Sequence, residues 1–385
     1  MVNSVFPRMA LFLLVLLVSA CASQNPYAGK SVIEAHRQLL RGAAFFPVDE
    51  PLPELEPVQM LAVNDDMRAF LDQHIPRKSI SDDMKLEAIL RGLLDKGLNL
   101  QYNNLTTYTA EQTFYARRGN CLSFTNLYIA LAREAGLDVS YQEVKVPPAW
   151  SAVGNRHYFS LHINVLVDLP RDRQRVVDFD VQHRSDRIKG TAVSDSTAAA
   201  QFDNNLAVYY LEERDLPLAF LYSRRAIEAR PQTGYFWANL GTILRRAGQL
   251  DDAEEAYITA IELSGEPAAV SNLARLYGQQ GKHELAALYA ERAQRYRSRN
   301  PYYLYELAEV AYDKGDFNDA NKLLRSAIGK RRDEPEFYRL YGLTWVQLGK
   351  PGRAEKSFEK AIRYNSNPER ATLYEHKLRL LANSN

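Results

Sequence analysis

The chain has two cysteines, and their surroundings differ. Cys21 follows Val18-Ser19-Ala20 at the end of an apolar run, which is the pattern of an export signal. Exported proteins usually pair their cysteines. If export processing uses Cys21, then Cys121 is the one free thiol, and such a thiol indicates linkage to a partner or a reactive nucleophile.

The residues beside Cys121 favour the nucleophile. Asn120 is a good helix N-cap, so we expect Cys121 in the first turn of a helix that ends at Gly136. Unpaired N–H groups and the positive end of the helix dipole stabilise a thiolate at that place. The alternative is a small buried cysteine without reactivity.

His162 is the base that we predict for this thiol. From Phe159 to Val167 the odd-numbered residues are apolar, while His162 and Asn164 belong to the alternate, polar set. A histidine that points away from the apolar face can take the thiol proton and later return it. His183 is a rival base, but it lies beyond the apolar pattern.

The following strand carries Asp178 and Asp180 on one face. An antiparallel register centred on Pro170 sets His162 opposite Asp178, and a register centred on Arg171 sets it opposite Asp180. Either carboxylate would fix the imidazole tautomer and stabilise its cation. We take Asp178 as the orienting acid and keep Asp180 as the alternative.

The sequence offers donors for an oxyanion but no sign of a cofactor. The backbone N–H of Cys121 and the side chain of Gln101 or Tyr102 are the candidate donors. No cluster of Cys or His has metal-ligand spacing, and no glycine-rich phosphate loop is present. We therefore predict no metal, no nucleotide and no other cofactor.

The elements that must position these groups form an α+β domain, with a helix on an antiparallel sheet. Apolar spacing predicts the helices and alternation predicts the strands. The helices are Asp65 to Gln73, Asp82 to Lys96 and the one that follows Asn120; the strands are Val139 to Val144, His157 to Leu166 and Arg175 to Val181.

This part of the chain resembles the transglutaminase-like superfamily of papain-type cysteine enzymes. The resemblance covers about residues 80 to 182 and rests on Thr109-Ala110-Glu111-Gln112, Arg118-Gly119-Asn120-Cys121, the helix Leu127 to Gly136, His162 and Val177-Asp178. It implies a triad of Cys121, His162 and Asp178. Many relatives have an aromatic residue two places after the histidine, where this chain has Asn164.

The family chemistry would be thiolate attack on an amide or ester carbonyl, followed by release of the acyl group. Water as acceptor gives a peptidase or amidase, which we favour, and an amine gives a cross-linking acyltransferase. A third interpretation is a non-catalytic scaffold in which the repeats described next carry the function.

After a polar stretch the chain becomes repetitive, at intervals of 33 or 34 residues. Three series of small residues keep this spacing: Ala207, Gly241, Ala274, Ala308, Gly342; Ala219, Ala253, Ala286, Ala320, Ala354; and Ala226, Ala260, Ala293, Ala327, Ala361. The pattern resembles the tetratricopeptide repeat, a pair of closely crossing helices. We predict five repeats that form an all-α solenoid, with a capping helix at Arg370 to Ala382.

The first helix of each pair normally lines the inner groove, where aromatic and arginine side chains are good anchors for a protein or peptide partner. By position, these anchors are Asn204, Tyr235, Arg275, Tyr302, Tyr305 and Arg339. An ordinary solvated helix face explains any single one of them equally well.

The N-terminal residues resemble the signal of a bacterial lipoprotein, which implies that Cys21 carries lipid. Ala22 and Ser23 directly follow Cys21 where some lipoproteins have an Asp, and the resemblance therefore implies an envelope protein on the outer membrane, facing the periplasm. The division of the chain is a signal peptide at 1–20, a tether at 21–58, the transglutaminase-like domain at 59–190, a linker at 191–200 and the repeats at 201–385.

The overall charge is almost balanced. Lys and Arg number 48 against 47 Asp and Glu, so the formal net charge is +1. A single-sign field is absent, and the sequence therefore does not predict binding to nucleic acid or a polybasic contact with a membrane.

Overall fold

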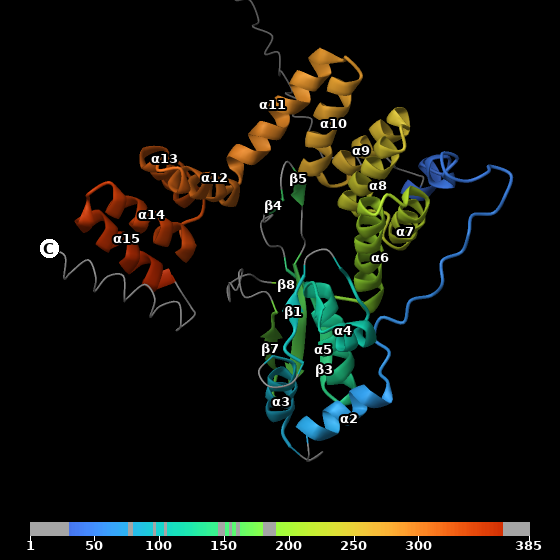
Figure 1. Ribbon diagram of the computed structural model, residues 1–385, viewed down its shortest axis with the longest axis horizontal. Helices are drawn as coiled ribbons and strands as arrows, with labels where there is room; N and C mark the ends of the chain where they lie inside the picture. Colours follow the sequence, from blue (N-terminus) through green and yellow to red (C-terminus); the bar gives the residue numbers. More distant parts are fainter. Residues whose placement is uncertain are drawn as a thin grey trace, which may run out of the picture.

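The computed structural model describes residues 31–75, 80–94, 98–103, 106–144, 151–153, 156–158, 162–179 and 190–364, with the backbone alone at 151–153, 156–158 and 162. A mixed helix–sheet domain precedes a series of paired helices (Figure 1). Among these residues no helix is long and apolar enough to span a membrane.

Four helices of the first domain bear on the site. They are α2 (Asp65–His74), α3 (Asp82–Leu94), α4 (Ala110–Ala116) and α5 (Cys121–Glu134). Three of them lie where the sequence predicts helices, and the fourth, α4, comes shortly before Cys121 in the chain. Thr109 and Gln112 form a capping box at the start of α4, which satisfies the free N–H groups of its first turn. The predicted helix after Asn120 is confirmed.

The central sheet has four antiparallel strands in the order β7-β6-β3-β8. The strands are β3 (Asp138–Val144), β6 (His162–Leu169), β7 (Arg173–Val177) and β8 (Gly190–Val193). Two small pairs accompany it: β1 (Gln101–Tyr102) with β2 (Arg118–Gly119), and β4 (Ser151–Val153) with β5 (Arg156–Tyr158). The single strand predicted from His157 is thus wrong, because residues 156–158 pair in the β4–β5 hairpin and β6 starts at His162.

The core of this domain lies between α5 and one face of the sheet. Leu127, Tyr128 and Leu131 of α5 are fully buried in it. The strands contribute alternate apolar residues to the same cluster: Val139, Tyr141, Ile163, Val165, Val167 and Val177. The period-two pattern of the sequence therefore defines the face that contacts α5.

Residues 191–200, which the sequence predicts to be a linker, are ordered elements of the fold. β8 pairs with β3, and α6 (Asp195–Glu212) begins two residues later, capped by Ser194. Ala198 and Phe202 of α6 belong to the core of the first domain, whereas Ala207 belongs to the core of the repeats. One helix therefore serves two cores.

A bidentate ion pair connects α5 to the start of α6. Arg133 Nη1 and Nη2 lie 2.6 and 2.9 Å from the two carboxylate oxygens of Asp195, and Arg133 also donates to the Val139 carbonyl. Hydrogen bonding by the Arg133 guanidinium holds the pKa of Asp195 below its usual range. This pair joins the end of α5 to the first turn of α6.

Up to residue 364, where the described part of the chain ends, the helical region contains five helix pairs, as the repeat spacing predicts. After α6, the helices are α7 (Leu216–Ala229), α8 (Gly234–Arg246), α9 (Leu250–Ser264), α10 (Pro267–Gln279), α11 (His283–Arg299), α12 (Pro301–Asp313), α13 (Phe317–Lys330), α14 (Pro335–Gln347) and α15 (Pro351–Tyr364). At Gly241 an added Cβ would lie 2.7 Å from the Tyr257 ring, so the close crossing of α8 and α9 requires a small residue. The predicted capping helix lies outside the described residues.

The repeats do not form one continuous core. α6 to α10 share a large apolar cluster, whereas α12 to α15 are held by separate smaller clusters. Ala293 is the single buried residue of α11. In Figure 1, α11 leads away from α10 towards a lobe formed by α12 to α15.

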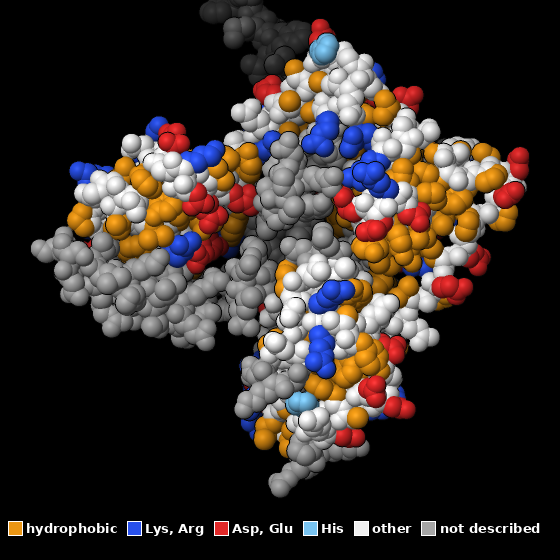
Figure 2. Space-filling model, in the orientation of Figure 1, with side chains coloured by type: hydrophobic (Ala, Val, Ile, Leu, Met, Phe, Trp, Pro, Cys, Tyr) orange, Lys and Arg blue, Asp and Glu red, His pale blue; other side chains and the backbone are white. Residues whose placement is uncertain are grey.

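Residues 31–56 are packed against the repeats, whereas the sequence predicts an extended tether there. We call this segment the strap. It contains α1 (Val32–Ala35) and a 3-10 turn (Leu39–Arg41), and it runs beside α7 to α9 before the chain reaches α2 (Figure 1). Val32, Leu39 and Leu40 are buried in the repeat core. In Figure 2, apolar side chains gather over this part of the molecule.

Gly42 allows the strap to approach α7. Its φ of 66° is left-handed, and an added Cβ would lie 2.4 Å from the Phe220 ring. The ring of Phe45 then contacts that of Phe220 at a centroid distance of 5.2 Å. Sequence composition did not reveal this contact, since proline-rich polar segments also form extended tethers.

The Arg133–Asp195 pair predicts a pH-dependent coupling between the two parts of the chain. Because the folded-state pKa of Asp195 is lowered, the pair stabilises the fold above the unfolded carboxyl pKa of about 3.9 and loses that contribution as pH falls through the folded value. Both side chains are more than a third exposed, so we expect only about 0.5–1 kcal/mol at neutral pH. A double-mutant cycle with Arg133→Gln and Asp195→Asn, followed by denaturant unfolding between pH 7 and pH 3, measures it.

The same cycle on Lys322 and Asp319, a pair exposed by 70% and 66%, is the control and should give a coupling near zero. A coupling of Arg133 with Asp195 that grows as the pH falls would contradict the assignment.

Candidate functional site

Cys121 occupies the first position of α5. Asn120 is its N-cap, with a φ of −87° and a ψ of −176°, and the side-chain oxygen accepts from the N–H of Ser123 at 3.0 Å. The thiol therefore lies at the positive end of a 14-residue helix, as the sequence predicts.

A network of buried polar groups holds this helix start in place. Asn120 Nδ2 donates to Thr107 Oγ1 at 2.6 Å, and the Ser123 hydroxyl donates to Asn120 Oδ1 at 3.0 Å. The N–H of Tyr108 donates to Ser123 Oγ at 2.8 Å. An added Cβ at Gly119 would lie 2.5 Å from Ser123 Cβ, so a larger residue cannot occupy that position without displacing the network.

The strand that carries His162 lies beside the thiol end of α5. Thr125, one turn after Cys121, donates its hydroxyl hydrogen to the carbonyl of Ile163 at 3.4 Å. The backbone of His162 pairs with Val144. The side chain of His162 lies outside what the structure describes, so its contact with Cys121 stays a prediction.

The observed register between β6 and β7 is the one centred on Arg171. Leu169 pairs with Arg173 around a turn in which Arg171 and Asp172 have positive φ angles of 66° and 56°. Continued by one residue past Val177, this register brings Asp178 opposite Asn164.

Asp178 accordingly contacts Asn164. Asn164 Nδ2 donates to Asp178 Oδ2 at 3.2 Å, and Asn164 itself is 3% exposed. The Pro170-centred register, which would set His162 opposite Asp178, is therefore not the observed one. Asp178 stays the orienting acid that the family resemblance implies, on a diagonal of the sheet where residues are about 7–8 Å apart. Asp180 and the rival base His183 lie outside the described residues.

The predicted oxyanion donors lie on β1. Gln101 and Tyr102 pair with Arg118 and Gly119, directly ahead of the N-cap of α5. The ring of Tyr102 is 6.2 Å from that of Phe124, and Tyr102 is 52% exposed. The phenol therefore lies over the first turn of the helix, in a position open to solvent.

The thiol itself is largely covered. Cys121 is 8% exposed and belongs to the apolar cluster of its domain. Within the described part of the chain, no group of three or more His, Cys, Asp or Glu residues could hold a metal ion. The chemistry that the described residues offer is therefore nucleophilic attack by the Cys121 sulfur.

The six predicted partner-binding residues differ in their surroundings. Asn204 is 5% exposed and accepts from Asn239 at 2.8 Å, so it contributes to helix packing. Tyr235 is partly buried, and Arg275 is exposed. None of these contacts identifies a bound partner, and the groove assignment stays a prediction.

The remaining three, Tyr302, Tyr305 and Arg339, form one cluster on α12 and α14. Arg339 Nη2 donates to the Tyr305 hydroxyl at 3.1 Å, and the Tyr302 hydroxyl donates to Glu334 at 2.8 Å. Burial raises the pKa of Glu334 and of both tyrosines. Tyr305 and Arg339 are thus engaged with each other and Tyr302 with Glu334, while all three side chains remain partly exposed.

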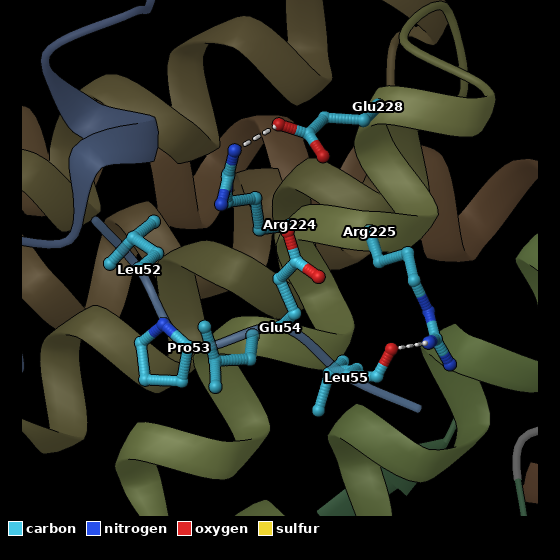
Figure 3. A pocket seen from close by; sticks show the side chains of 8 residues that line it. Leu52, Pro53, Glu54, Leu55, Arg224, Arg225 and Glu228 are labelled. Atoms are coloured by element: carbon cyan, nitrogen blue, oxygen red, sulfur yellow. Dashed lines mark hydrogen bonds and ion pairs between the residues drawn. The ribbon is translucent and has the colours of Figure 1, made fainter. Parts of the chain in front are cut away.

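The sequence did not reveal a site on α7 that is occupied by the strap. Leu52 to Leu55 line a shallow pocket of about 420 Å³ together with Leu221, Arg224, Arg225 and Glu228 (Figure 3). Arg225 donates to the carbonyls of Leu55 and Glu56 at 3.4 and 3.1 Å. The residues on the outer helix faces differ between repeats, and this difference is the sequence signal that could have revealed the site.

Two parts of the chain match known families. Residues 78–158 match the transglutaminase-like superfamily, and residues 238–303 and 305–368 match the tetratricopeptide repeat. The protein therefore contains a transglutaminase-like domain followed by a tetratricopeptide-repeat solenoid, which confirms both resemblances and the predicted fold class.

Individual relatives are similar over part of the chain. The anaphase-promoting complex subunit cut9 of Schizosaccharomyces pombe is 27% identical over 158 residues, which are 41% of this chain and 24% of that protein. The chain thus spans about a quarter of the length of this relative.

Two solved structures are similar over comparable stretches. YrrB, described as a TPR protein with an unusual peptide-binding site, is 15% identical over 46% of this chain and 92% of its own, with a TM-score of 0.25. Pseudomonas aeruginosa pilF is 16% identical over 50% of this chain and 90% of its own, with a TM-score of 0.27.

The cap network predicts that Asn120 stabilises the domain. Asn120→Ala removes an N-cap and leaves buried partners unsatisfied, so the free energy of unfolding should fall by about 2 kcal/mol. Asn120→Asp keeps the acceptor for Ser123 but loses the donation to Thr107, and it should cost less. Denaturant unfolding measures both variants, and an alanine variant as stable as wild type would contradict the role of the cap.

Proposed function

We propose that this protein is a cysteine hydrolase, a peptidase or amidase, with a repeat arm that binds a protein partner. The observation that carries the proposal is the placement of Cys121 at the capped N-terminus of α5, in a domain that matches the transglutaminase-like superfamily. The tetratricopeptide repeats support the second part of the proposal, since such repeats generally bind proteins.

In the proposed reaction, His162 takes the proton of Cys121 and the thiolate attacks the carbonyl carbon of an amide or ester. The tetrahedral oxyanion is stabilised by the backbone N–H of Cys121 and by Tyr102. It collapses to a thioester as the protonated imidazole gives its proton to the leaving amine or alcohol. Water, deprotonated by His162, then releases the acyl group as a carboxylic acid and restores the thiol.

Asp178 would hold the imidazole in the tautomer that this cycle needs. The hydrogen bond from Asn164 fixes the position of the Asp178 carboxylate, and Asn164 occupies the place where many relatives have an aromatic residue. The side-chain amide of Asn164 would orient the carboxylate of Asp178, whereas an aromatic ring in this position would cover the imidazole.

A second candidate function is favoured by the burial of the thiol. At 8% exposure and within an apolar cluster, Cys121 also fits a structural residue of a non-catalytic scaffold. In that case the transglutaminase-like domain docks other proteins and the repeats carry the biological activity.

Thiol labelling separates these two functions. The full-length protein is treated with iodoacetamide near neutral pH, and intact mass measures the rate of modification. A catalytic thiolate should react about tenfold faster than a free model thiol, which is only a few per cent ionised at that pH. His162→Ala should remove the advantage and shift the pH profile of labelling upward.

The denatured chain is the matched reference, because there Cys121 is an exposed, ordinary cysteine. Slower labelling in the native protein than in denaturant would sink the hydrolase proposal and support the scaffold. Cys121→Ala establishes that the measured modification belongs to this thiol.

We further propose that the protein is a lipoprotein of the bacterial envelope, anchored through lipid on Cys21 and facing the periplasm from the outer membrane. The signal pattern before Cys21 supports this proposal. Because the strap begins ten residues after Cys21 and is packed on the repeats, the anchor would hold the repeats close to the membrane surface.

Lipid anchoring predicts that the protein is recovered with membranes. Cys21→Ser should move it to the soluble fraction and abolish labelling by a radioactive fatty acid, because no other cysteine lies near the signal. Cys121→Ser serves as the matched control and should leave both properties unchanged. Membrane recovery of the Cys21→Ser protein would contradict the anchor.

A further inference from the structure

We propose that the outward face of α11 binds an extended, acidic, leucine-containing segment of a partner protein, in the way that α7 binds the strap of its own chain. This inference is independent of the chemistry of Cys121. It assigns a binding surface to the second helix of a repeat, outside the inner groove.

The two helices share a sequence pattern that the other repeats lack. Residues 218–226 of α7 read Leu-Ala-Phe-Leu-Tyr-Ser-Arg-Arg-Ala, and residues 285–293 of α11 read Leu-Ala-Ala-Leu-Tyr-Ala-Glu-Arg-Ala. At the places of the two leucines, the other three repeats have polar residues: Asp252 and Glu255, Asp319 and Lys322, and Arg353 and Lys356. Apolar outer faces at these positions are therefore specific to the first and third repeats.

The structure places the two patterns equivalently. Tyr222 of α7 contacts Tyr210 of α6 at a ring-centroid distance of 5.4 Å, and Tyr289 of α11 contacts Tyr277 of α10 at the same distance. Each pattern is thus anchored through its tyrosine to the first helix of its own repeat. The leucines and the arginine project from the same side of both helices.

On α7 this face is occupied. Leu221 is 7% exposed beneath the Leu52–Leu55 part of the strap, and Arg225 donates to two strap carbonyls. The contact combines an apolar surface with an arginine that binds main-chain oxygens, which suits an extended segment (Figure 3).

On α11 the equivalent face is open. Leu285 and Leu288 are 39% and 53% exposed. Arg292 stands at the place of Arg225, and within the described ranges no hydrogen bond or ion pair joins it to another residue. The outward face of α11 therefore has two leucines and an arginine at the same places as the strap-binding face of α7, but here the leucines are exposed.

Two differences define the chemistry of the segment that would bind. Asp203 of α6 accepts from Arg225, but Val270 stands at the equivalent place beside Arg292, so the bound segment must supply the carboxylate. Ala287 replaces Phe220, so the aromatic half of the strap, Phe45 and Phe46, has no ring to contact. The face therefore fits the Leu-Pro-Glu-Leu-Glu half of the strap.

A peptide that copies residues 50–57, Glu-Pro-Leu-Pro-Glu-Leu-Glu-Pro, is the probe. It carries a fluorescent label and is titrated by anisotropy with the full-length protein. We expect binding, and we expect Leu288→Glu and Arg292→Glu each to weaken it about tenfold or more, since one removes a leucine that the peptide would cover and the other a charged hydrogen-bond donor. A peptide with serine in place of both leucines should not bind.

The matched control is Val310→Glu on α12, which alters an apolar side chain of similar exposure, 50%, outside the pattern. It should leave the affinity unchanged and so show that a new surface carboxylate is not itself the cause.

Three results would overturn the proposal. The first is no binding up to millimolar protein. The second is binding that Leu221→Glu abolishes and Leu288→Glu does not, because the peptide then replaces the strap on α7. The third is a dimer in sedimentation velocity that Leu288→Glu converts to a monomer, which would assign the face to a second copy of the chain.

Discussion

The arrangement of the whole chain depends on α6, a single helix that contributes to two hydrophobic cores. Its first turns place Ala198 and Phe202 against the sheet domain, and its later turns place Ala207 in the repeats. A helix is stiff, so the packing of one half fixes the direction of the other half. The Arg133–Asp195 pair at its start adds a weak contact between α6 and α5.

The candidate catalytic site depends on a different constraint, the satisfaction of buried polar groups around Asn120. One amide caps α5, donates to Thr107 and accepts from Ser123, so the start of the helix and the loop at 106–108 are held as a unit. The same network fixes Cys121 at the end of the helix dipole. The low exposure of Cys121 also fits a structural thiol at the same helix start.

The strap and the repeats show how one helix-pair scaffold can carry two kinds of binding surface. Tyr305 and Arg339, which we predict to line the inner groove, already contact each other, and this contact orders their side chains. The outer face of α7 is covered by the strap of its own chain, whereas the equivalent face of α11 is uncovered. α11 also stands where the apolar core of the repeats is interrupted.

Local pattern was enough to determine the helix that begins at Cys121, the repeat period and the apolar face of the sheet, because capping, helical spacing and strand alternation act over a few residues. It left the register of β6 and β7 open between two solutions, and only the positive φ angles of Arg171 and Asp172 decided that Asp178 lies opposite Asn164. The strap, the ordered residues 191–200 and the double role of α6 were likewise decided by tertiary packing. These contacts join segments that are far apart in the chain, so the composition of either segment alone does not predict them.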